Sequence, residues 1–240
     1  MTTRWPAKPD EYAESWRGPV RPLGPVDSVD PSLCPTGAIS ARGVDQGRCI
    51  LCGRCVAERP DLFAWSTGLG AAALVRQQLI VPDETDEAVA AARARLAERT
   101  RALRRSVHVR HVDAGSDGSE EWEIQALLGP VYDLHRLGVF ITASPRHADV
   151  LLVTGAGARG MSGPLRTTYD GMPDPKVVIA AGTDAVSGGL LAESEATTGG
   201  VSATVPVDIF VAGSPPSPFG ILNALLIAVG KLADGGKGTR

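Results

Sequence analysis

Cysteine is scarce in this chain, and all four cysteines lie between Cys34 and Cys55. No thiol remains for a second site elsewhere. Aromatic residues make up 5% of the chain and the formal net charge is -3, which excludes the stacking surface and basic footprint of a nucleic-acid-binding protein. The first residues, MTTRWPAKPD, lack the apolar stretch of a secretory signal, and the chain has no run of about 18 apolar residues. We therefore expect a soluble, cytoplasmic protein.

The cysteines themselves form a recognisable pattern. Cys49, Cys52 and Cys55 are spaced as CxxCxxC, and Cys34 is followed by proline. This is the thiolate set that holds one 4Fe-4S cubane in bacterial ferredoxins, with Gly53 permitting the tight loop. Two disulfides and a four-thiolate zinc site are the alternatives. The missing secretory signal disfavours disulfides, and zinc sites usually pair two CxxC units.

The chain is long enough for one large domain or two smaller ones, because it has 240 residues of which 43% are hydrophobic. Residues 1–30 are rich in proline and carry Trp5 and Trp16, so we expect an extended arm along a partner subunit, or else a disordered tail. The remaining predicted parts are a ferredoxin-like 4Fe-4S unit (31–82), a linker helix (83–105), an α/β domain (106–234) and a tail (235–240).

The linker helix is predicted from a capping residue at its start and from apolar residues that recur along one face. Asp83 is a suitable N-cap, and Val89, Leu96 and Leu103 recur every seven residues. A solvated linker and a helix that presents a basic face to an anionic partner are the two readings.

From about Ser106 onward, short apolar runs alternate with helical stretches. The helix candidates begin near Ser119, Ser162 and Pro218. Strands that are apolar along their length and separated by helices indicate a parallel sheet covered on both faces. We predict a doubly wound, flavodoxin-like α/β domain, preceded by a small ferredoxin-like α+β unit. The predicted strands are SVHVRHV, GVFITAS, ADVLLVTGA, KVVIAAG and VDIFVAG.

The segment CPTGAI followed by VDQGRCILCGRCVAERPDLF resembles the core of a two-cluster ferredoxin. The resemblance implies that the ligands of the second cluster are kept and those of the first are lost. Gly24, Asp27, Asp30 and Arg59 stand where the first cluster would have cysteine. The loss is confined to one cluster, so we expect the surviving cluster to be intact.

A second resemblance covers about half the chain, from Val107 to Leu232, through ASPRHADVLLVTGA, LRTTYDGMPDPKVVIAAG, SGG and VPVDIFVAGSPPSP. These residues resemble the small subunit of energy-converting nickel–iron hydrogenases of the formate hydrogenlyase type, and the B subunit of complex I (NADH-quinone oxidoreductase). Such subunits hold a proximal 4Fe-4S cluster after the strands of the sheet, beside a large subunit.

The resemblance also implies that this proximal cluster has been lost here. Its ligand positions fall on Asp117, Glu120, Asp184 and Ser214, and a further cysteine position falls on Ala114. Carboxylates and a hydroxyl do not ordinarily replace thiolates on iron–sulfur iron. The surrounding scaffold is retained, including Glu121, Ser187, Gly188, Gly189, Pro215 and Pro216.

The degenerate site has two readings. A hard divalent cation could bind the carboxylates, with Ser214 or water completing the oxygen shell. Alternatively, Arg146, His147 or Arg159 neutralises the acids in a salt-bridged filler, which is the reading we favour.

Together these features predict an electron-transfer subunit of a hydrogenase-like or complex-I-like oxidoreductase, with one 4Fe-4S cluster and no catalysis of its own. Its partners would be a large-subunit homologue and, through it, membrane subunits at the cytoplasmic membrane face. The alternative is a structural or assembly subunit, and a third hypothesis is a metal-dependent enzyme that uses the acidic site.

Overall fold

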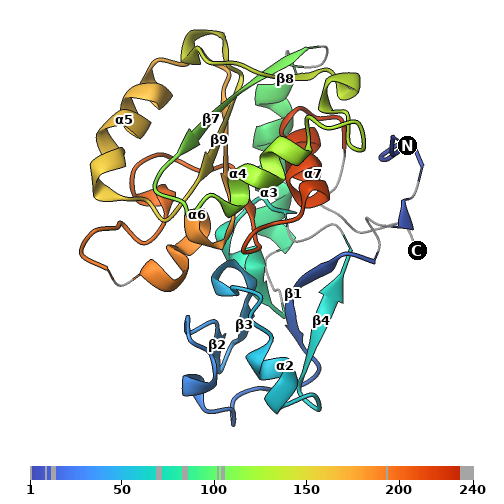
Figure 1. The fold of residues 1–240 in the computed structure, drawn as a ribbon, viewed down its shortest axis with the longest axis vertical. Helices are drawn as coiled ribbons and strands as arrows, with labels where there is room; N and C mark the ends of the chain where they lie inside the picture. Colours follow the sequence, from blue (N-terminus) through green and yellow to red (C-terminus); the bar gives the residue numbers. More distant parts are fainter. Residues whose placement is uncertain are drawn as a thin grey trace.

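A computed structural model describes residues 2–232, apart from residues 9, 12–14, 69–71, 83–85, 102, 104, 105 and 193. Asp83, predicted as a helix cap, and the predicted tail lie outside the described residues. The chain builds a larger α/β domain and a smaller, strand-containing unit beneath it (Figure 1).

The larger domain is built on one mixed sheet. Among the described residues this sheet has six strands in the order β5-β11-β10-β9-β7-β8. All neighbours pair in parallel except β5, which runs antiparallel to β11. The five parallel strands follow the flavodoxin-like order, in which ligands gather beyond the carboxyl ends. The strands are β5 (Ala72–Ala73), β7 (Val107–Asp113), β8 (Val139–Ile141), β9 (Val150–Thr154), β10 (Val177–Ala181) and β11 (Ile209–Val211).

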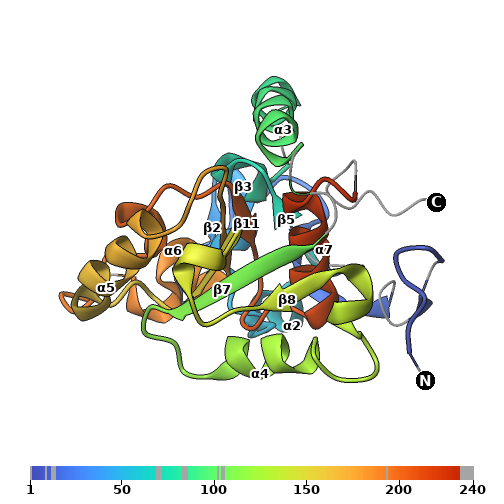
Figure 2. The ribbon, with the colours of Figure 1, turned by 90° about the horizontal axis from the view of Figure 1, so that it is seen from above.

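Both faces of this sheet are covered. On one face, Val109 and Leu152 pack in a core that includes Leu222 and Ile124. On the other, Leu151 and Val153 pack with Leu165. Figure 2 shows the helices of the two faces on opposite sides of the strands. The doubly wound α/β fold predicted from the apolar runs is therefore confirmed. The helices are α3 (Asp86–Thr100), α4 (Ser119–Ala126) and α7 (Pro218–Ala228) on the first face, and α5 (Arg159–Asp170) and α6 (Thr183–Ser187) on the second.

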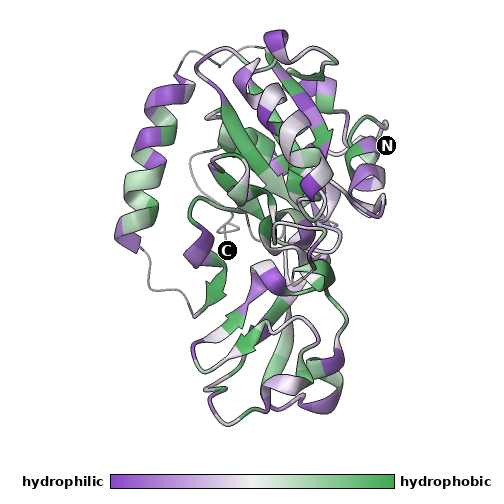
Figure 3. Ribbon diagram, turned by 90° about the vertical axis from the view of Figure 1, so that its left-hand side faces the viewer, coloured by the Kyte–Doolittle hydropathy of each residue, from purple (hydrophilic) through white to green (hydrophobic). Residues whose placement is uncertain are grey.

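Two helices illustrate how the sequence sets this arrangement. Helix α7 begins at Pro218 after Ser217, whose side chain accepts a hydrogen bond from the Gly220 N–H, and all its residues are buried, as expected for a helix that is apolar all round. Helix α3 packs through its predicted stripe, since Val89, Leu96 and the following Leu103 are buried in the first core. Along the rest of the helix, hydrophilic residues alternate with alanines (Figure 3).

The smaller unit contains all four cysteines. Its strands are short and are connected by loops. Its core contains Val20, Leu33, Val44 and Phe63. Strands β1 (Arg17–Pro22) and β4 (Phe63–Thr67) pair antiparallel, and β2 (Ile39–Ser40), β3 (Gly43–Asp45) and β6 (Ile80–Val81) form a second sheet beside α2 (Arg54–Glu58).

The first thirty residues differ from the predicted extended arm. Residues 17–22 form β1, and Val26 and Val29 are buried in the core of the smaller unit. Trp5 packs edge-on against Phe219 of α7, with ring centroids 5.9 Å apart. The apolar surface of this indole is thus buried on the chain's own α/β domain, so no partner subunit is needed to cover it.

Segment 72–73 also differs from its predicted place in the ferredoxin-like unit, because β5 joins the large sheet. No helix in the described part of the chain is both long and apolar enough to cross a membrane. The short 3-10 helices are η1 (Pro31–Leu33), η2 (Gln46–Arg48), η3 (Arg76–Leu79), η4 (Leu134–Leu137), η5 (Pro145–His147), η6 (Gly189–Leu191) and η7 (Val201–Ala203).

Candidate iron–sulfur site and the degenerate site beside it

The loop from Cys49 to Cys55 curls through two residues in the left-handed region. Leu51 has φ 58° and Gly53 has φ 73°. A Cβ on Gly53 would lie 2.8 Å from the ring of Trp65, so only glycine fits both the backbone angle and the space. Helix α2 starts directly after this glycine. The glycine predicted to permit a tight loop is therefore required there.

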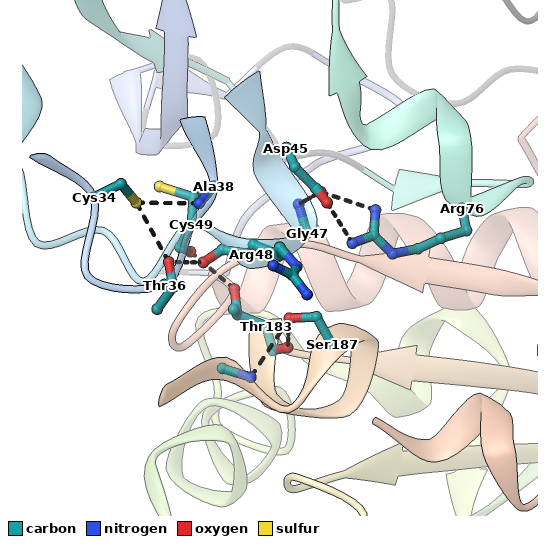
Figure 4. Close-up of polar contacts among 11 residues, drawn as sticks. Cys34, Thr36, Ala38, Asp45, Gly47, Arg48, Cys49, Arg76, Thr183 and Ser187 are labelled. Carbon is teal, nitrogen blue, oxygen red and sulfur yellow. Dashed lines mark hydrogen bonds and ion pairs between the residues drawn. The ribbon is translucent and has the colours of Figure 1, made fainter. Parts of the chain in front are cut away.

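A second loop brings Cys34 to the same unit. The Thr36 hydroxyl donates to the Arg48 carbonyl at 2.6 Å, which ties the CPTGA segment to η2. The Ala38 N–H donates to Cys34 Sγ at 3.2 Å, and Thr36 Oγ1 lies 3.5 Å from the same sulfur (Figure 4). These contacts fix the position of the Cys34 sulfur relative to η2.

The four thiols are free, so the disulfide alternative finds no support. Burial above all, together with the charges of Cys49, Cys34 and Cys52, raises the pKa of Cys55 to about 11. Burial likewise raises the pKa of Cys49, which also senses Cys34 and Cys52. All four sulfurs therefore act on one another within one neighbourhood, and a cationic cofactor would relieve their mutual repulsion.

All four candidate ligands of this site are thiols, the soft ligands that iron–sulfur clusters and zinc take. Within the described residues, no three His, Cys, Asp or Glu side chains are grouped closely enough to hold one metal ion.

The cysteine loop is fastened to the α/β domain at α6. The buried Thr183 hydroxyl donates to the Cys49 carbonyl at 2.9 Å and accepts from the Gly213 N–H at 3.4 Å. A Cβ on Gly47 would lie 2.8 Å from a methyl of Val186, so η2 approaches α6 closely. Figure 4 shows α6 directly below the cysteine loops. No local pattern predicts this contact, because Thr183 and Cys49 are 134 residues apart.

A charged pair braces the same loop from the other side. Arg76 donates to both carboxylate oxygens of Asp45, at 2.9 and 2.8 Å. Asp45 also accepts from the Gly47 N–H at 2.9 Å. The backbone before Cys49 is thus held by a bidentate ion pair, a strong and directional interaction.

The positions of the lost proximal cluster lie at the carboxyl ends of β7, β10 and β11. Glu120 is 1% exposed, and one of its oxygens, Oε1, has no hydrogen-bond partner. Burial raises the pKa of Glu120 to about 7, and the nearby charges of Asp184 and Asp117 contribute in the same direction. The structure therefore brings these three acids together. Ser214 follows Gly213, whose carbonyl accepts from the Thr183 N–H at 2.6 Å.

Neither predicted occupant of this site is supported by the geometry. Among the described residues, no ion pair joins Arg146, His147 or Arg159 to Asp117, Glu120 or Asp184. The Arg159 side chain instead donates to the Glu195 carbonyl. The predicted salt-bridged filler is therefore not found in the described part of the chain, and burial raises the pKa of Glu120 instead. The three acids likewise form no group that could hold one cation.

The retained Glu121 has a different environment from its neighbour. Its carboxylate accepts hydrogen bonds from the Thr154 and Ser116 hydroxyls. His111 Nε2 lies 3.4 Å from it, while burial lowers the pKa of this imidazole. Glu121 is therefore a fully engaged structural residue that joins the ends of β7 and β9 to α4.

The strand order and the cysteine loops define the class: a flavodoxin-like α/β domain joined to a small unit that carries four free thiols. Residues 118–228 match the family described as the NADH ubiquinone oxidoreductase 20 kDa subunit, and residues 44–94 match the single-cluster 4Fe-4S domain of ferredoxin I. The second match includes Cys49, Cys52 and Cys55.

Curated relatives agree with the family. Formate hydrogenlyase subunit 7 of Escherichia coli is 39% identical over 63% of this chain and 58% of its own length. A probable membrane-bound hydrogenase subunit of Pyrococcus furiosus is 42% identical over 58% of this chain and 83% of its own. The chain belongs to the family of the NADH ubiquinone oxidoreductase 20 kDa subunit, which confirms the resemblance seen in the sequence. The chain thus spans less than two thirds of the length of the Escherichia coli relative.

Among solved structures, a chain of the archaeal membrane-bound sulfane sulfur reductase aligns with 28% identity and a TM-score of 0.48. The alignment covers 57% of this chain and 77% of that one.

Proposed function

We propose that this protein is an electron-transfer subunit of a hydrogenase-like or complex-I-like assembly, with one 4Fe-4S cluster bound by Cys34, Cys49, Cys52 and Cys55. The observation that carries the proposal is that four free thiols act on one another on neighbouring loops, and that the chain has no other cysteine. A cubane held there would accept and release one electron.

The chain's own residues position and tune this site. The Ala38 N–H donates to Cys34 Sγ and the Thr36 hydroxyl contacts it, so both hold this sulfur in place. Cys49 is 8% exposed, whereas Cys52 is exposed. The site therefore has a protected side toward α6 and an open side through which a redox partner could approach.

Anaerobic purification followed by iron and acid-labile sulfide analysis tests the assignment. We expect about four iron and four sulfide per chain, and one cubane signal in electron paramagnetic resonance after reduction. Cys52→Ala should lose most of the iron, whereas the exposed control Ser40→Ala should keep it. Protein without iron and sulfide, or with more than one cubane, would contradict the proposal.

We further propose that the α/β domain docks a large-subunit homologue at the edge of the degenerate site. Trp122 on α4 is 72% exposed, and Leu190 and Leu191 in η6 are 66% and 51% exposed. These apolar side chains lie close in the sequence to Glu120 and Asp184, and exposed apolar side chains of this kind mark a surface that a partner protein covers. Both relatives are named as subunits of hydrogenase or hydrogenlyase assemblies, which supports a partner of this kind and attachment at the cytoplasmic membrane face.

Co-purification with the native partners tests the docking. Trp122→Glu should abolish recovery of the complex, and Leu23→Glu, a change of another exposed apolar residue, on the smaller unit, should not. Equal recovery of both variants would argue against this surface.

The second candidate is a structural or assembly subunit whose C-terminal domain only docks a large-subunit homologue, while electrons enter and leave through the N-terminal cluster alone. The absence of cysteine from every proximal-cluster position favours it. A large subunit that has lost its nickel-binding cysteine pairs would point the same way.

A further inference from the structure

Glu120 is a buried carboxyl group without a counter-ion. It is 1% exposed, and its Oε1 has no hydrogen-bond partner, while Oε2 accepts from the Ser119 hydroxyl at 3.2 Å. An ionised carboxylate in such a place is costly, because Oε1 is buried without a donor and only the Ser119 hydroxyl reaches Oε2. The side chain therefore has a strong tendency to bind a proton.

The charged groups that act on Glu120 are all acidic. Asp117 lies in the loop before α4, and Asp184 lies on α6. The carboxylate of the next residue, Glu121, already accepts hydrogen bonds from the hydroxyls of Thr154, at the end of β9, and Ser116, in the loop after β7. No basic side chain is among the groups that shift its pKa. Its protonation thus responds to any further negative charge nearby.

Glu120 is also close to the cysteine loop. A Cβ on Gly182 would clash with Oε1, so the carboxyl group rests against the backbone at the start of α6. The next residue, Thr183, donates to the Cys49 carbonyl at 2.9 Å. The path from the Glu120 carboxyl group to the cysteine loop runs over about two residues, so the two sites are on the order of 10 Å apart. All the intervening groups are buried, so solvent does little to screen a charge at one end from the other.

We propose that Glu120 is a redox-linked proton-binding site, which takes up one proton when the cluster site of Cys34, Cys49, Cys52 and Cys55 gains one electron. This inference rests on the proposed function, since it requires the cluster. The electron comes from a one-electron donor and the proton from solvent, and the only bond formed is the O–H bond on the Glu120 carboxyl. The position once used to carry a cluster ligand would thus serve to compensate charge.

The expected coupling follows from Coulomb's law. One added charge at about 10 Å, with an effective dielectric constant of about 20, raises the proton affinity of Glu120 roughly tenfold. For a one-electron couple, a tenfold change corresponds to about 59 mV. The pKa of Glu120 of about 7 puts the transition near neutral pH.

Redox titration of the anaerobic, cluster-containing protein tests the proposal, with dithionite as reductant and mediator dyes. The midpoint potential should fall by about 59 mV between about pH 5.5 and pH 9.5 and level off at both ends. Glu120→Gln should have the same iron content and a flat profile. Asp184→Asn should move the falling part of the curve to lower pH, because it removes a repelling charge.

Glu123→Gln is the matched control, since Glu123 lies on the same helix but faces Tyr132. It should keep the wild-type profile. A wild-type potential that does not change with pH, or a slope that survives in Glu120→Gln, overturns the inference while leaving the cluster assignment intact. Protein without iron and sulfide would instead refute the proposed function, so the two failures are distinguishable.

Discussion

The buried Glu120 also predicts how the stability of the α/β domain changes with pH. The pKa of Glu120 is about 7 in the folded protein, against 4.5 for the ordinary carboxyl group. The folded state therefore binds more protons than the unfolded state between these values, and stability falls as pH rises through this window. Below about pH 4.5 both states are protonated and no penalty remains.

The magnitude follows from the two pKa values. A difference of about 2.5 pH units corresponds to roughly 3 kcal/mol of lost stability above pH 7. Glu120→Gln removes the ionisation and keeps the shape of the side chain. The variant should match the wild type near pH 5 and exceed it at pH 8, by about 6 to 12 °C in melting temperature for a chain of this size.

Differential scanning calorimetry of both proteins from pH 5 to pH 8 provides the measurement, with the exposed Glu98→Gln as control. The control should follow the wild type at every pH. A constant gap between Glu120→Gln and wild type, or a variant that is less stable at pH 8, would show that the carboxyl group is not protonated on folding and would refute the reasoning.

Three further changes test the contacts around the cysteine loop. Thr183→Val should cost about 1 to 2 kcal/mol of unfolding free energy in urea denaturation, because it leaves a buried carbonyl without its donor, and Thr183→Ser should restore most of it. Gly53→Ala should lower the iron content of anaerobically purified protein several-fold, since a Cβ there meets the Trp65 ring at 2.8 Å on a left-handed backbone. Arg76→Ala should cost about 1 to 3 kcal/mol by breaking the half-buried bidentate pair, whereas Arg59→Ala, which breaks an exposed pair, should cost less than about 1 kcal/mol.

The elements that the sequence predicted are those with local signals. Four of the five parallel strands are continuous apolar runs, whereas β7 alternates apolar and polar residues, and Ser217 with Pro218 indicates the start of helix α7. The cysteine spacing likewise indicates its loop without any structure. Each of these features depends on neighbours within a few residues, so each is readable from the chain alone.

The features that escaped prediction depend on pairing over long distances. Residues 17–22 were assigned to an arm, yet they pair with β4, more than forty residues away. Segment 72–73 crosses to the large sheet, where only the partner strand β11 determines its place. The state of Glu120 was missed for the same reason: composition offers several arginines as counter-ions, and only the geometry shows that none reaches it.

Helix α6 is where these observations meet. It binds the cysteine loop through Thr183, and its next residue, Asp184, belongs to the degenerate site. Replacing thiolates by carboxyl groups at that site removes an electron carrier but leaves the scaffold and its contact with the cysteine loop in place. A buried carboxyl group in this position still interacts electrostatically with the cysteine site, because the buried groups between them screen the charge weakly. Loss of the proximal ligands therefore need not disconnect the two units: electron transfer between them would end, while electrostatic coupling would persist.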